Sequence, residues 1–361
     1  MSVFLLSHLR IKFAIIKRKK WKEKKKMKKS KIIGVSLALL FIIFVTVKLS
    51  PVWGNELPSS ESEYINAKDF GAVGNDYMDD KSAIQAAIDY AQTSGIGKVK
   101  LTGNKEYLLN SGIILKKGVE VELGNNTKLM VNGNFKAIQL ENDSSIKNGI
   151  IMVIVTTYNS DVIYLDGKYK FTSWDRVKID NVSIINASNT YTGTALSLYA
   201  KGDNHYISYV NFSNLNINGF STGIRLKTEK PTTGNSWINA NRFTNITIDA
   251  CISAIELSGS KTVPNETSGN QFTNLQIQLE KNSISALKVS GQDNTFQAMI
   301  WDVQNVTNKQ IVHFTSDAVG NKLSFNLNET PVGVLFFVCC ISVFIKNDMV
   351  RIAPKSAFLT W

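Results

Sequence analysis

The segments VNFSNLNI (210–217), NRFTNITI (241–248) and NQFTNLQI (270–277) repeat one pattern, and VKIDNVSI (177–184) is an earlier copy. Each copy is followed by a second short alternating segment: TALSL (194–198), TGIRL (222–226), SAIEL (253–257) and SALKV (285–289). A fifth, degenerate copy combines TFQAMIW (295–301) with KQIVHF (309–314). Alternation with a period of two predicts half-buried strands. Two or three such strands per repeat, joined by Asn, Gly and Ser turns, predict one coil of a parallel β-solenoid.

One Asn recurs in every repeat, at Asn181, Asn214, Asn245 and Asn274, with separations of 33, 31 and 29 residues. The same turn position recurs about every 4.8 Å along a solenoid, so an inward Asn can hydrogen-bond to the Asn residues above and below it. This predicts an internal asparagine ladder. Asn is also a common turn residue, but that alternative explains poorly why Phe or Ile stands two residues before each of the four.

One helical segment precedes the repeats. Asp79 or Asp80 supplies an N-cap, and Ala83, Ile84, Ala87, Ile88 and Ala91 fall on one helical face. A single amphipathic helix before a solenoid is expected to cover the open end of the first coil, which would otherwise expose its core and strand edges.

The stretch INAKDFGAVGNDYMDDKSAIQAAIDYAQTSGIGKVKLTGNKEYLL (65–109) resembles the N-terminal signature of the pectate-lyase-like superfamily, which includes the polygalacturonase-related proteins. Asn75 stands for the usual Asp, Asp76 and Tyr77 disturb the second Gly, and Thr102 replaces Pro. The resemblance implies an all-β fold, a right-handed parallel β-helix over 64–328 with the N-terminal capping helix. These motifs are scaffold in the family, so they identify architecture and not chemistry. The matching residues are Asp69 to Gly71, Gly74, Asp79, Asp80, Ala83, Ile84, Ala87, Gly97, Val99, Leu101 and Tyr107.

The positive charge of the chain lies in its first residues. The net charge is +12, and residues 1–31 hold thirteen Lys or Arg against the single Glu23, which leaves 28 basic and 28 acidic residues elsewhere. A DNA-binding face should lie in the folded body, so nucleic-acid binding is excluded. The basic run precedes sixteen uncharged residues, IIGVSLALLFIIFVTV (32–47), and this order predicts a cytoplasmic n-region followed by a signal peptide or a transmembrane anchor at 32–53.

Both fates of residues 32–53 place the rest of the chain outside the cytoplasmic membrane, after a linker at 54–63. Met27 also begins a conventional export signal, MKKSKIIGVSLALL. Translation of the native protein from Met27, without residues 1–26, is therefore a second hypothesis. Cys251, Cys339 and Cys340 cannot form a disulfide framework for an exported domain, and the scattered His8, His205 and His313 predict no structural zinc site.

The resemblance implies a test for catalytic motifs. Polygalacturonases carry Asn-Thr-Asp-Gly-Ile, and alignment on the strands places its catalytic Asp at Thr222, Ser253 and Ser285, so none of these coils supplies it. Asp249-Ala250-Cys251-Ile252 resembles Asp-Asp-Cys-Ile without the second Asp, and Arg225-Leu226-Lys227 resembles Arg-Ile-Lys but precedes it. There is no Gly-His-Gly. Because glycoside hydrolysis needs converging carboxylates, an ordinary polygalacturonase activity is not expected.

Outward-facing columns are the remaining candidates. If Ile224, Ile255 and Leu287 face inward, Arg225, Glu256 and Lys288 face outward on successive coils, with Ser197 before them and His313 after them. A second column is Asn218, Asp249 and Gln278. The structural reading is a ladder of alternating charge. The functional reading assigns Asp249, Glu256 and Arg225 to catalysis and Lys227, Lys288, Asn218 and Trp237 to substrate binding.

Other candidates carry a weaker signal. Asp175, Arg176, Asp203 and His205 lie in or near predicted turns, and Tyr191, Tyr199, Tyr206 and Tyr209 offer aromatic faces for sugars or for packing. After Asn328, VGVLFFVCCISVFI (332–345) begins a hydrophobic and irregular tail over 329–361. A second membrane contact, a C-terminal cap and a segment outside the ancestral reading frame all remain open for that tail.

Two functions follow as expectations. The first is an exported or membrane-anchored carbohydrate-active protein that acts on a polysaccharide by lyase or glycoside hydrolase chemistry, with calcium as the ion that a lyase would imply. The second is a non-catalytic glycan-binding surface module or a degenerate relative of an enzyme. Convergence of three charged side chains in an outer groove favours the first, and evenly spaced ladders favour the second.

Overall fold

The computed structural model describes residues 63–174, 177–306, 311–327 and 343–345, all within one compact unit, Leu57–Trp361. The predicted n-region, the predicted signal or anchor at 32–53 and nearly all of the predicted linker lie outside these residues. Within them, no helix has the length and apolar character needed to cross a bilayer.

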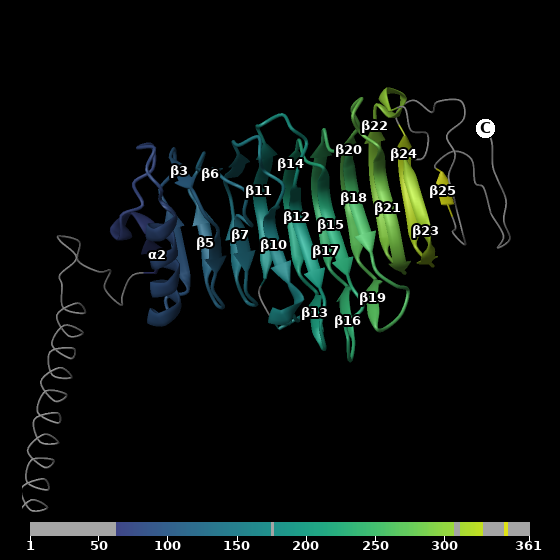
Figure 1. Ribbon diagram of the computed structural model, residues 1–361, viewed down its shortest axis with the longest axis horizontal. Helices are drawn as coiled ribbons and strands as arrows, with labels where there is room; N and C mark the ends of the chain where they lie inside the picture. The colour runs from purple at the N-terminus through teal and green to yellow at the C-terminus, as the bar shows by residue number, and fades with distance from the viewer. Residues whose placement is uncertain (1–62, 175–176, 307–310, 328–342, 346–361) are drawn as a thin grey trace, which may run out of the picture. The chain divides into compact units, whose positions relative to one another are not determined.

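Two long sheets made of parallel strands run along the solenoid (Figure 1). The strand pairs of the described chain are parallel, and most strands pair with strands of the coils before and after them, as in β11–β14–β17–β20. The predicted parallel β-solenoid is therefore confirmed. The first sheet has 14 strands: β1 (Ile65–Asn66), β2 (Lys98–Leu101), β3 (Glu106–Leu109), β5 (Glu120–Leu123), β6 (Lys128–Val131), β8 (Ser145–Lys147), β9 (Ile150–Val153), β11 (Lys178–Asn186), β14 (Asn211–Asn218), β17 (Arg242–Asp249), β20 (Gln271–Gln278), β22 (Thr295–Trp301), β24 (Lys322–Leu327) and β25 (Val343–Ile345).

The second sheet has 11 strands and carries the second segment of each repeat. Its strands are β4 (Ile113–Leu115), β7 (Ile138–Leu140), β10 (Asp161–Asp166), β12 (Thr194–Ala200), β13 (His205–Ser208), β15 (Thr222–Thr228), β16 (Ser236–Asn239), β18 (Ser253–Ser258), β19 (Asn265–Ser268), β21 (Ser285–Gln292) and β23 (Val312–Val319). The fifth copy forms β22 and β23, so its degenerate sequence still pairs in the same sheets.

The core lies between the two sheets and consists of identical positions stacked coil on coil. Phe212, Phe243, Phe272 and Phe296 are buried, and their ring centroids lie 4.5, 4.3 and 4.9 Å apart in near-parallel stacks. Each buried aromatic removes a large apolar area from water, and each stacked pair adds about 0.5–1.5 kcal/mol. The Phe of the repeat therefore holds neighbouring coils in register.

The prediction of an internal ladder at Asn181, Asn214, Asn245 and Asn274 is wrong, because these residues are exposed on the outside of the first sheet. Their φ angles, between 53° and 56°, are left-handed. A left-handed residue shifts the alternation by one, so that the Phe two residues before and the apolar residue one after it both face inward. The side chains still bond along the axis, as Asn245 Nδ2 to Asn214 Oδ1 at 3.2 Å and Asn274 Nδ2 to Asn245 Oδ1 at 2.6 Å.

A different set of Asn residues forms the internal ladder: Asn241, Asn270, Asn294 and Asn321. They stand just before β17, β20, β22 and β24. The side-chain oxygens of Asn270, Asn294 and Asn321 each accept hydrogen bonds from the backbone N–H and the side-chain amide of the Asn one coil earlier. Each amide thus satisfies backbone groups at a buried corner, where an unpaired N–H or C=O is destabilising.

A helix lies at the place predicted between Asp79 and Ala91. It is α2 (Lys81–Ser94), and it buries Ile84, Ala87, Ile88 and Ala91 against the first coils. The Asp80 carboxylate does not cap the helix and instead accepts hydrogen bonds from the backbone N–H groups of Val73, Gly74 and Leu108. That α2 closes the end of the solenoid stays a prediction. Three short 3₁₀ turns complete the helices of the described chain: η1 (Ala67–Phe70), η2 (Gly167–Tyr169) and η3 (Val303–Asn305).

Within the predicted tail, only β25 is described. Its residues pair in parallel with β24, from Leu323 with Val343 to Phe325 with Ile345. At least this part of the tail continues the first sheet.

Candidate functional site

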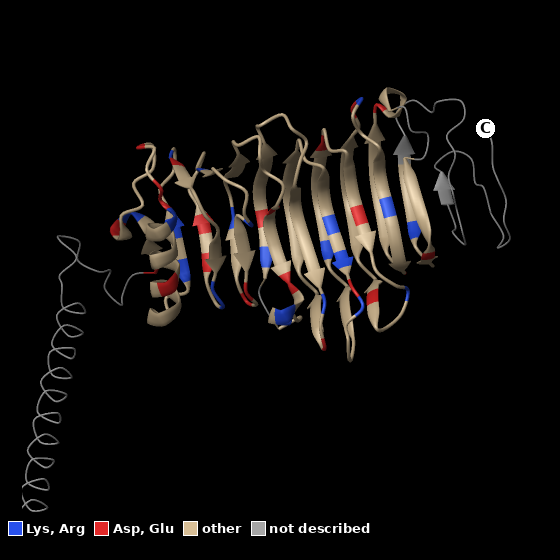
Figure 2. Cartoon of the chain, viewed as in Figure 1, with Lys and Arg blue, Asp and Glu red and all other residues tan. Residues whose placement is uncertain are grey.

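The predicted outward column on the second sheet is present in the predicted register. Arg225 pairs with Glu256, Glu256 with Lys288 and Lys288 with His313, while Ser197 precedes Arg225. Figure 2 shows positively, negatively and positively charged segments in turn on the neighbouring strands β15, β18 and β21. The period-two alternation positions them, because Ile224, Ile255 and Leu287 are buried on the opposite face.

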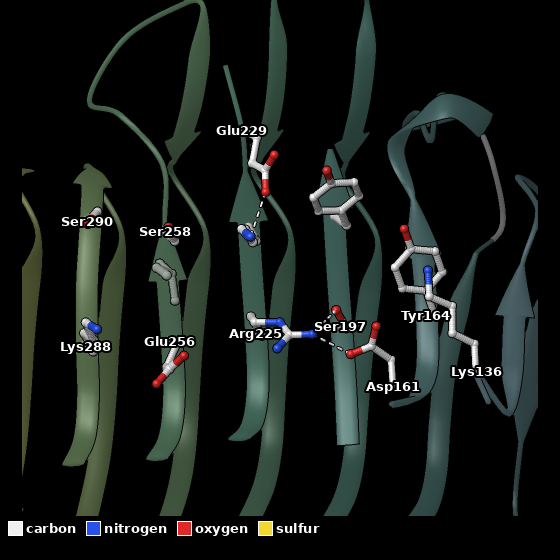
Figure 3. Close-up of a pocket in the computed structure, with 13 residues that line it drawn as sticks. Lys136, Asp161, Tyr164, Ser197, Arg225, Glu229, Glu256, Ser258, Lys288 and Ser290 are labelled. Carbon is white, nitrogen blue, oxygen red and sulfur yellow. Dashed lines mark hydrogen bonds and ion pairs between the residues drawn. The ribbon is translucent and has the colours of Figure 1, made fainter. Parts of the chain in front are cut away.

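An open groove of about 540 Å³ lies on the outer face of the second sheet, and we call it the outer groove (Figure 3). Its lining includes four residues of this column, Ser197, Arg225, Glu256 and Lys288. It crosses β10, β12, β15, β18 and β21, and Lys136 reaches it from the turn before β7, so six successive coils contribute to it. Four cations and three carboxylates line it, with tyrosines and serines between them: Lys136, Arg225, Lys227, Lys288, Asp161, Glu229, Glu256, Tyr164, Tyr199, Ser197, Ser258 and Ser290.

Arg225 does not pair with its charged neighbour in the column. Its Nη2 lies 2.5 Å from Asp161 Oδ1, two coils earlier, and 3.4 Å from Ser197 Oγ in the coil between them. Among the described residues no ion pair joins Arg225 to Glu256 or Glu256 to Lys288. The column does alternate in charge from coil to coil, as its structural reading requires, but Arg225 crosses Ser197 and pairs with Asp161 instead of with Glu256.

Asp161 is a residue that the sequence analysis missed. It pairs in register with Thr194, which pairs with Thr222, which pairs with Ser253 and then with Ser285. This is the column to which the alignment assigned the polygalacturonase Asp, and in β10 the column carries an Asp. The sequence signal for Asp161 is Asn159-Ser160-Asp161-Val162-Ile163, which lies one coil before TALSL (194–198).

Lys136 and Tyr164 form the end of the groove that precedes Asp161 (Figure 3). The Lys136 Nζ lies 3.3 Å from the centroid of the Tyr164 ring, a cation–π contact. Burial lowers the pKa of the Lys136 amine, an effect that the charges of Asp161 and Asp166 partly offset. Burial, with the Asp166 carboxylate that accepts from the phenol, raises the pKa of Tyr164. No motif marks Lys136, which stands in the turn before β7.

The carboxylates of the groove differ in their partners. Glu229 lies 2.7 Å from Lys227 Nζ and 3.0 Å from Lys201 Nζ, and these contacts lower the pKa of Glu229 to about 2. Asp161 is held by Arg225. Within the described chain, Glu256 and Lys288 have no ion-pair partner, so both are available to a ligand.

Other predicted site residues lie elsewhere. Asn218 and Asp249 end β14 and β17 of the first sheet, where Asn218 Nδ2 donates to Asp249 Oδ2 at 2.8 Å. The structure therefore does not bring Asp249 into the groove with Arg225 and Glu256. Trp237, on β16, stacks on Tyr206 with centroids 4.8 Å apart and planes 4° from parallel, so their facing ring surfaces are covered.

Of the candidates with a weaker sequence signal, some line the outer groove and others do not. Tyr199 lines the outer groove, while Tyr191, Asp203, His205 and Tyr209 do not. Asp175 and Arg176 lie outside the described residues. Along the described chain no three His, Cys, Asp or Glu side chains gather as a metal-binding group.

A comparison with protein-family models finds no match. A segment of 65 residues, 16% of the chain, is 43% identical to mannuronan C5-epimerase AlgE3 of Azotobacter vinelandii, and it spans only 4% of that protein. Solved structures that resemble the chain include the Streptococcus pneumoniae surface protein and adhesin PfbA, with a TM-score of 0.41 and 14% identity over 78% of this chain and 88% of its own.

Two further structures belong to the same group. The A-module of mannuronan C-5 epimerase AlgE4 of Azotobacter vinelandii has a TM-score of 0.34 and 17% identity over 78% of this chain and 94% of its own. The tailspike of Escherichia coli bacteriophage HK620 has a TM-score of 0.35 and 10% identity over 78% of this chain and 65% of its own. These neighbours are right-handed parallel β-helix proteins, the fold class that the sequence predicts.

Proposed function

We propose that this chain binds an acidic polysaccharide in the outer groove and acts on it there. The observation that carries the proposal is a set of four cations that reach one open groove from three different coils: Lys136, Arg225, Lys227 and Lys288. A long groove across stacked strands suits an extended polymer, and Lys and Arg suit its carboxylates. The partial relative is named for mannuronan, a word that denotes a polymer of a uronic acid, and this supports the same ligand class.

Between the two chemistries, the groove favours proton abstraction over hydrolysis. Hydrolysis needs a pair of carboxylates free to act as acid and as base or nucleophile. Here Asp161 is bound to Arg225 and Glu229 to two lysines, which leaves Glu256. Removal of a proton next to a uronate carboxylate needs a base and a cation that neutralises the carboxylate. Lys136, whose pKa is lowered by burial, fits the base, and Arg225 fits the cation.

Binding is tested by titrating the purified protein with polymannuronate, polygalacturonate and uncharged dextran. Lys288→Gln is expected to weaken binding of both polyuronates about tenfold or more, since a hydrogen bond to a charged group contributes about 1.5–3 kcal/mol. The matched control is Arg242→Gln, which removes one exposed cation from the first sheet and should leave affinity unchanged. Equal binding of dextran, or equal losses in the two variants, would contradict the proposal.

The enzymatic part has its own test. If Lys136 is the base, Lys136→Met should lower the rate of unsaturated-product or epimer formation by a factor of about 10²–10⁴ while binding of the polyuronate persists. Ultraviolet absorbance detects the unsaturated product, and NMR of the polymer detects the epimer. Binding by the parent protein with no product from either polymer, in calcium or in chelator, would support the alternative of a non-catalytic glycan-binding module.

Export is a part of the proposal that rests on sequence alone. The basic residues of 1–31 and the apolar residues of 32–47 support passage across, or anchoring in, the cytoplasmic membrane. An extracellular or cell-surface location would bring the groove to polysaccharides outside the cell. Protease accessibility of the β-helix in intact cells tests this location.

A further inference from the structure

A second pocket, lined mostly by uncharged residues, adjoins the outer groove. It has a volume of about 230 Å³ and shares the Arg225 and Asp161 side chains with the groove, which places their ion pair at the junction. Its wall comes from three successive coils, at the residues that start β10, β12 and β15 and those just before them. We call it the hydroxyl pocket, and Asn159, Ser160, Gly193, Thr194, Ser221 and Thr222 line the rest of it.

Two threonine hydroxyls that bond to no other described protein group face the hydroxyl pocket. Thr194 and Thr222 are 3% and 6% exposed, yet within the described chain neither hydroxyl makes a hydrogen bond. Further along the same column the hydroxyls are satisfied, since Ser253 Oγ and Ser285 Oγ lie 3.0 Å apart. Neither oxygen is among the buried polar atoms that lack a partner in the described chain, so both are accessible from the pocket and can donate to and accept from a ligand.

The backbone around the pocket is already paired. The carbonyls of Ser160, Gly193 and Ser221 accept from the N–H groups of Thr194, Thr222 and Ser253 at 2.9, 3.2 and 2.9 Å. Gly193 has a φ of +74°, and a Cβ there would lie 2.7 Å from the Tyr158 ring. The free hydrogen-bonding groups of the pocket are therefore side chains, held on a backbone that does not need to move.

We propose that the hydroxyl pocket binds an uncharged sugar unit that is covalently linked to the acidic unit in the outer groove. The inference rests on the proposed function and narrows its ligand to a heteropolysaccharide with both neutral and acidic units. Sugar hydroxyls donate and accept, as threonine hydroxyls do. A carboxylate in this pocket would lie against the Asp161 carboxylate, which disfavours an acidic unit there.

The test compares oligosaccharides of equal length, titrated into the full chain. One is an oligogalacturonate, in which every unit is acidic. Two others, from hyaluronan and from unsulfated chondroitin, alternate glucuronate with an uncharged N-acetylhexosamine. At least one alternating oligosaccharide is expected to bind more tightly than the oligogalacturonate although it carries half the charge. Weaker binding of both alternating oligosaccharides, with measurable binding of the oligogalacturonate, would overturn the inference and leave the proposed function standing.

Two variants locate the effect. Thr222→Val, which keeps the shape and removes the hydroxyl, should weaken binding of the alternating oligosaccharide about 3- to 10-fold and leave oligogalacturonate binding unchanged. Ser253→Ala, in the same column but outside the pocket, is the matched control and should change neither. Equal effects of the two variants would refute the pocket's role. Absence of binding by every acidic oligosaccharide would refute the proposed function, and the inference with it.

Discussion

Replacing Asn270 by Ala removes an inner rung of the internal asparagine ladder. The side chain is fully buried, and its Oδ1 accepts from the Asn241 N–H and Nδ2 at 3.2 and 2.9 Å. Its Nδ2 donates to the Ile238 carbonyl at 3.1 Å and to Asn294 Oδ1 at 3.0 Å. Alanine removes the partner of the Asn241 backbone N–H and of the Ile238 carbonyl. Asn241 Nδ2 keeps the Ile207 carbonyl at 3.1 Å, and Asn294 Oδ1 keeps the Asn270 backbone N–H at 3.0 Å.

At about 1–3 kcal/mol for each unsatisfied buried group, two such groups predict a loss of roughly 2–6 kcal/mol in the free energy of unfolding. Urea denaturation followed by circular dichroism measures it. The matched control is Asn274→Gly, because Asn274 is exposed and glycine accepts its φ of 53°, so that this change should stay within about 0.5 kcal/mol. A loss below about 1 kcal/mol for Asn270→Ala, or an equal loss for Asn274→Gly, would refute the assignment of the inner and outer ladders.

Three further predictions concern stability and charge. Phe243→Leu should destabilise the fold by about 0.5–1.5 kcal/mol more than Phe296→Leu, because Phe243 stacks on two rings and Phe296 on one, and thermal unfolding of both variants checks this. Glu229 has a depressed pKa of about 2, so its contribution is present above the unfolded pKa of about 4.5 and is lost as the pH falls toward 2. The Tm difference between the parent and Glu229→Gln, expected to reflect less than about 1 kcal/mol for this partly exposed group, should vanish over that range. A double-mutant cycle of Asp161→Asn and Arg225→Gln should give a coupling of about 0.5–3 kcal/mol, and additive effects would contradict the ion pair.

The register of the solenoid was predictable because the repeat contains it. Aligning the repeats on Asn181, Asn214, Asn245 and Asn274 also aligns the buried Phe positions, and the structure pairs the strands in that alignment. The direction of these Asn side chains was not predictable from alternation alone. A strict period of two continues through the strand, whereas the left-handed residue interrupts it and turns the Asn outward.

The true internal ladder was hidden by incomplete repetition. Asn241 and Asn270 begin two of the four aligned repeats, but Val177 and Val210 hold the same place in the other two. The column becomes all Asn only when Asn294 and Asn321 are added, and those belong to copies too degenerate to be aligned with the others. Burial at a corner, and not frequency in the repeat, decides which Asn side chains bond inside.

In the candidate site too, the sequence predicts the face on which a residue lies but not the partner of its side chain. The backbone places Arg225, Glu256 and Lys288 on one face, and period-two alternation is sufficient to predict that placement. A guanidinium on a long side chain, however, can reach beyond the adjacent strand, and its partner depends on what lies between. Ser197 is small and buried, so Arg225 passes over it to Asp161, 64 residues away in sequence. Because Arg225 pairs with Asp161 and not with Glu256, the Glu256 carboxylate is open to a ligand on one side of Arg225, as is the Lys288 amine. The hydroxyls of Thr194 and Thr222 are open to a ligand on another side of Arg225.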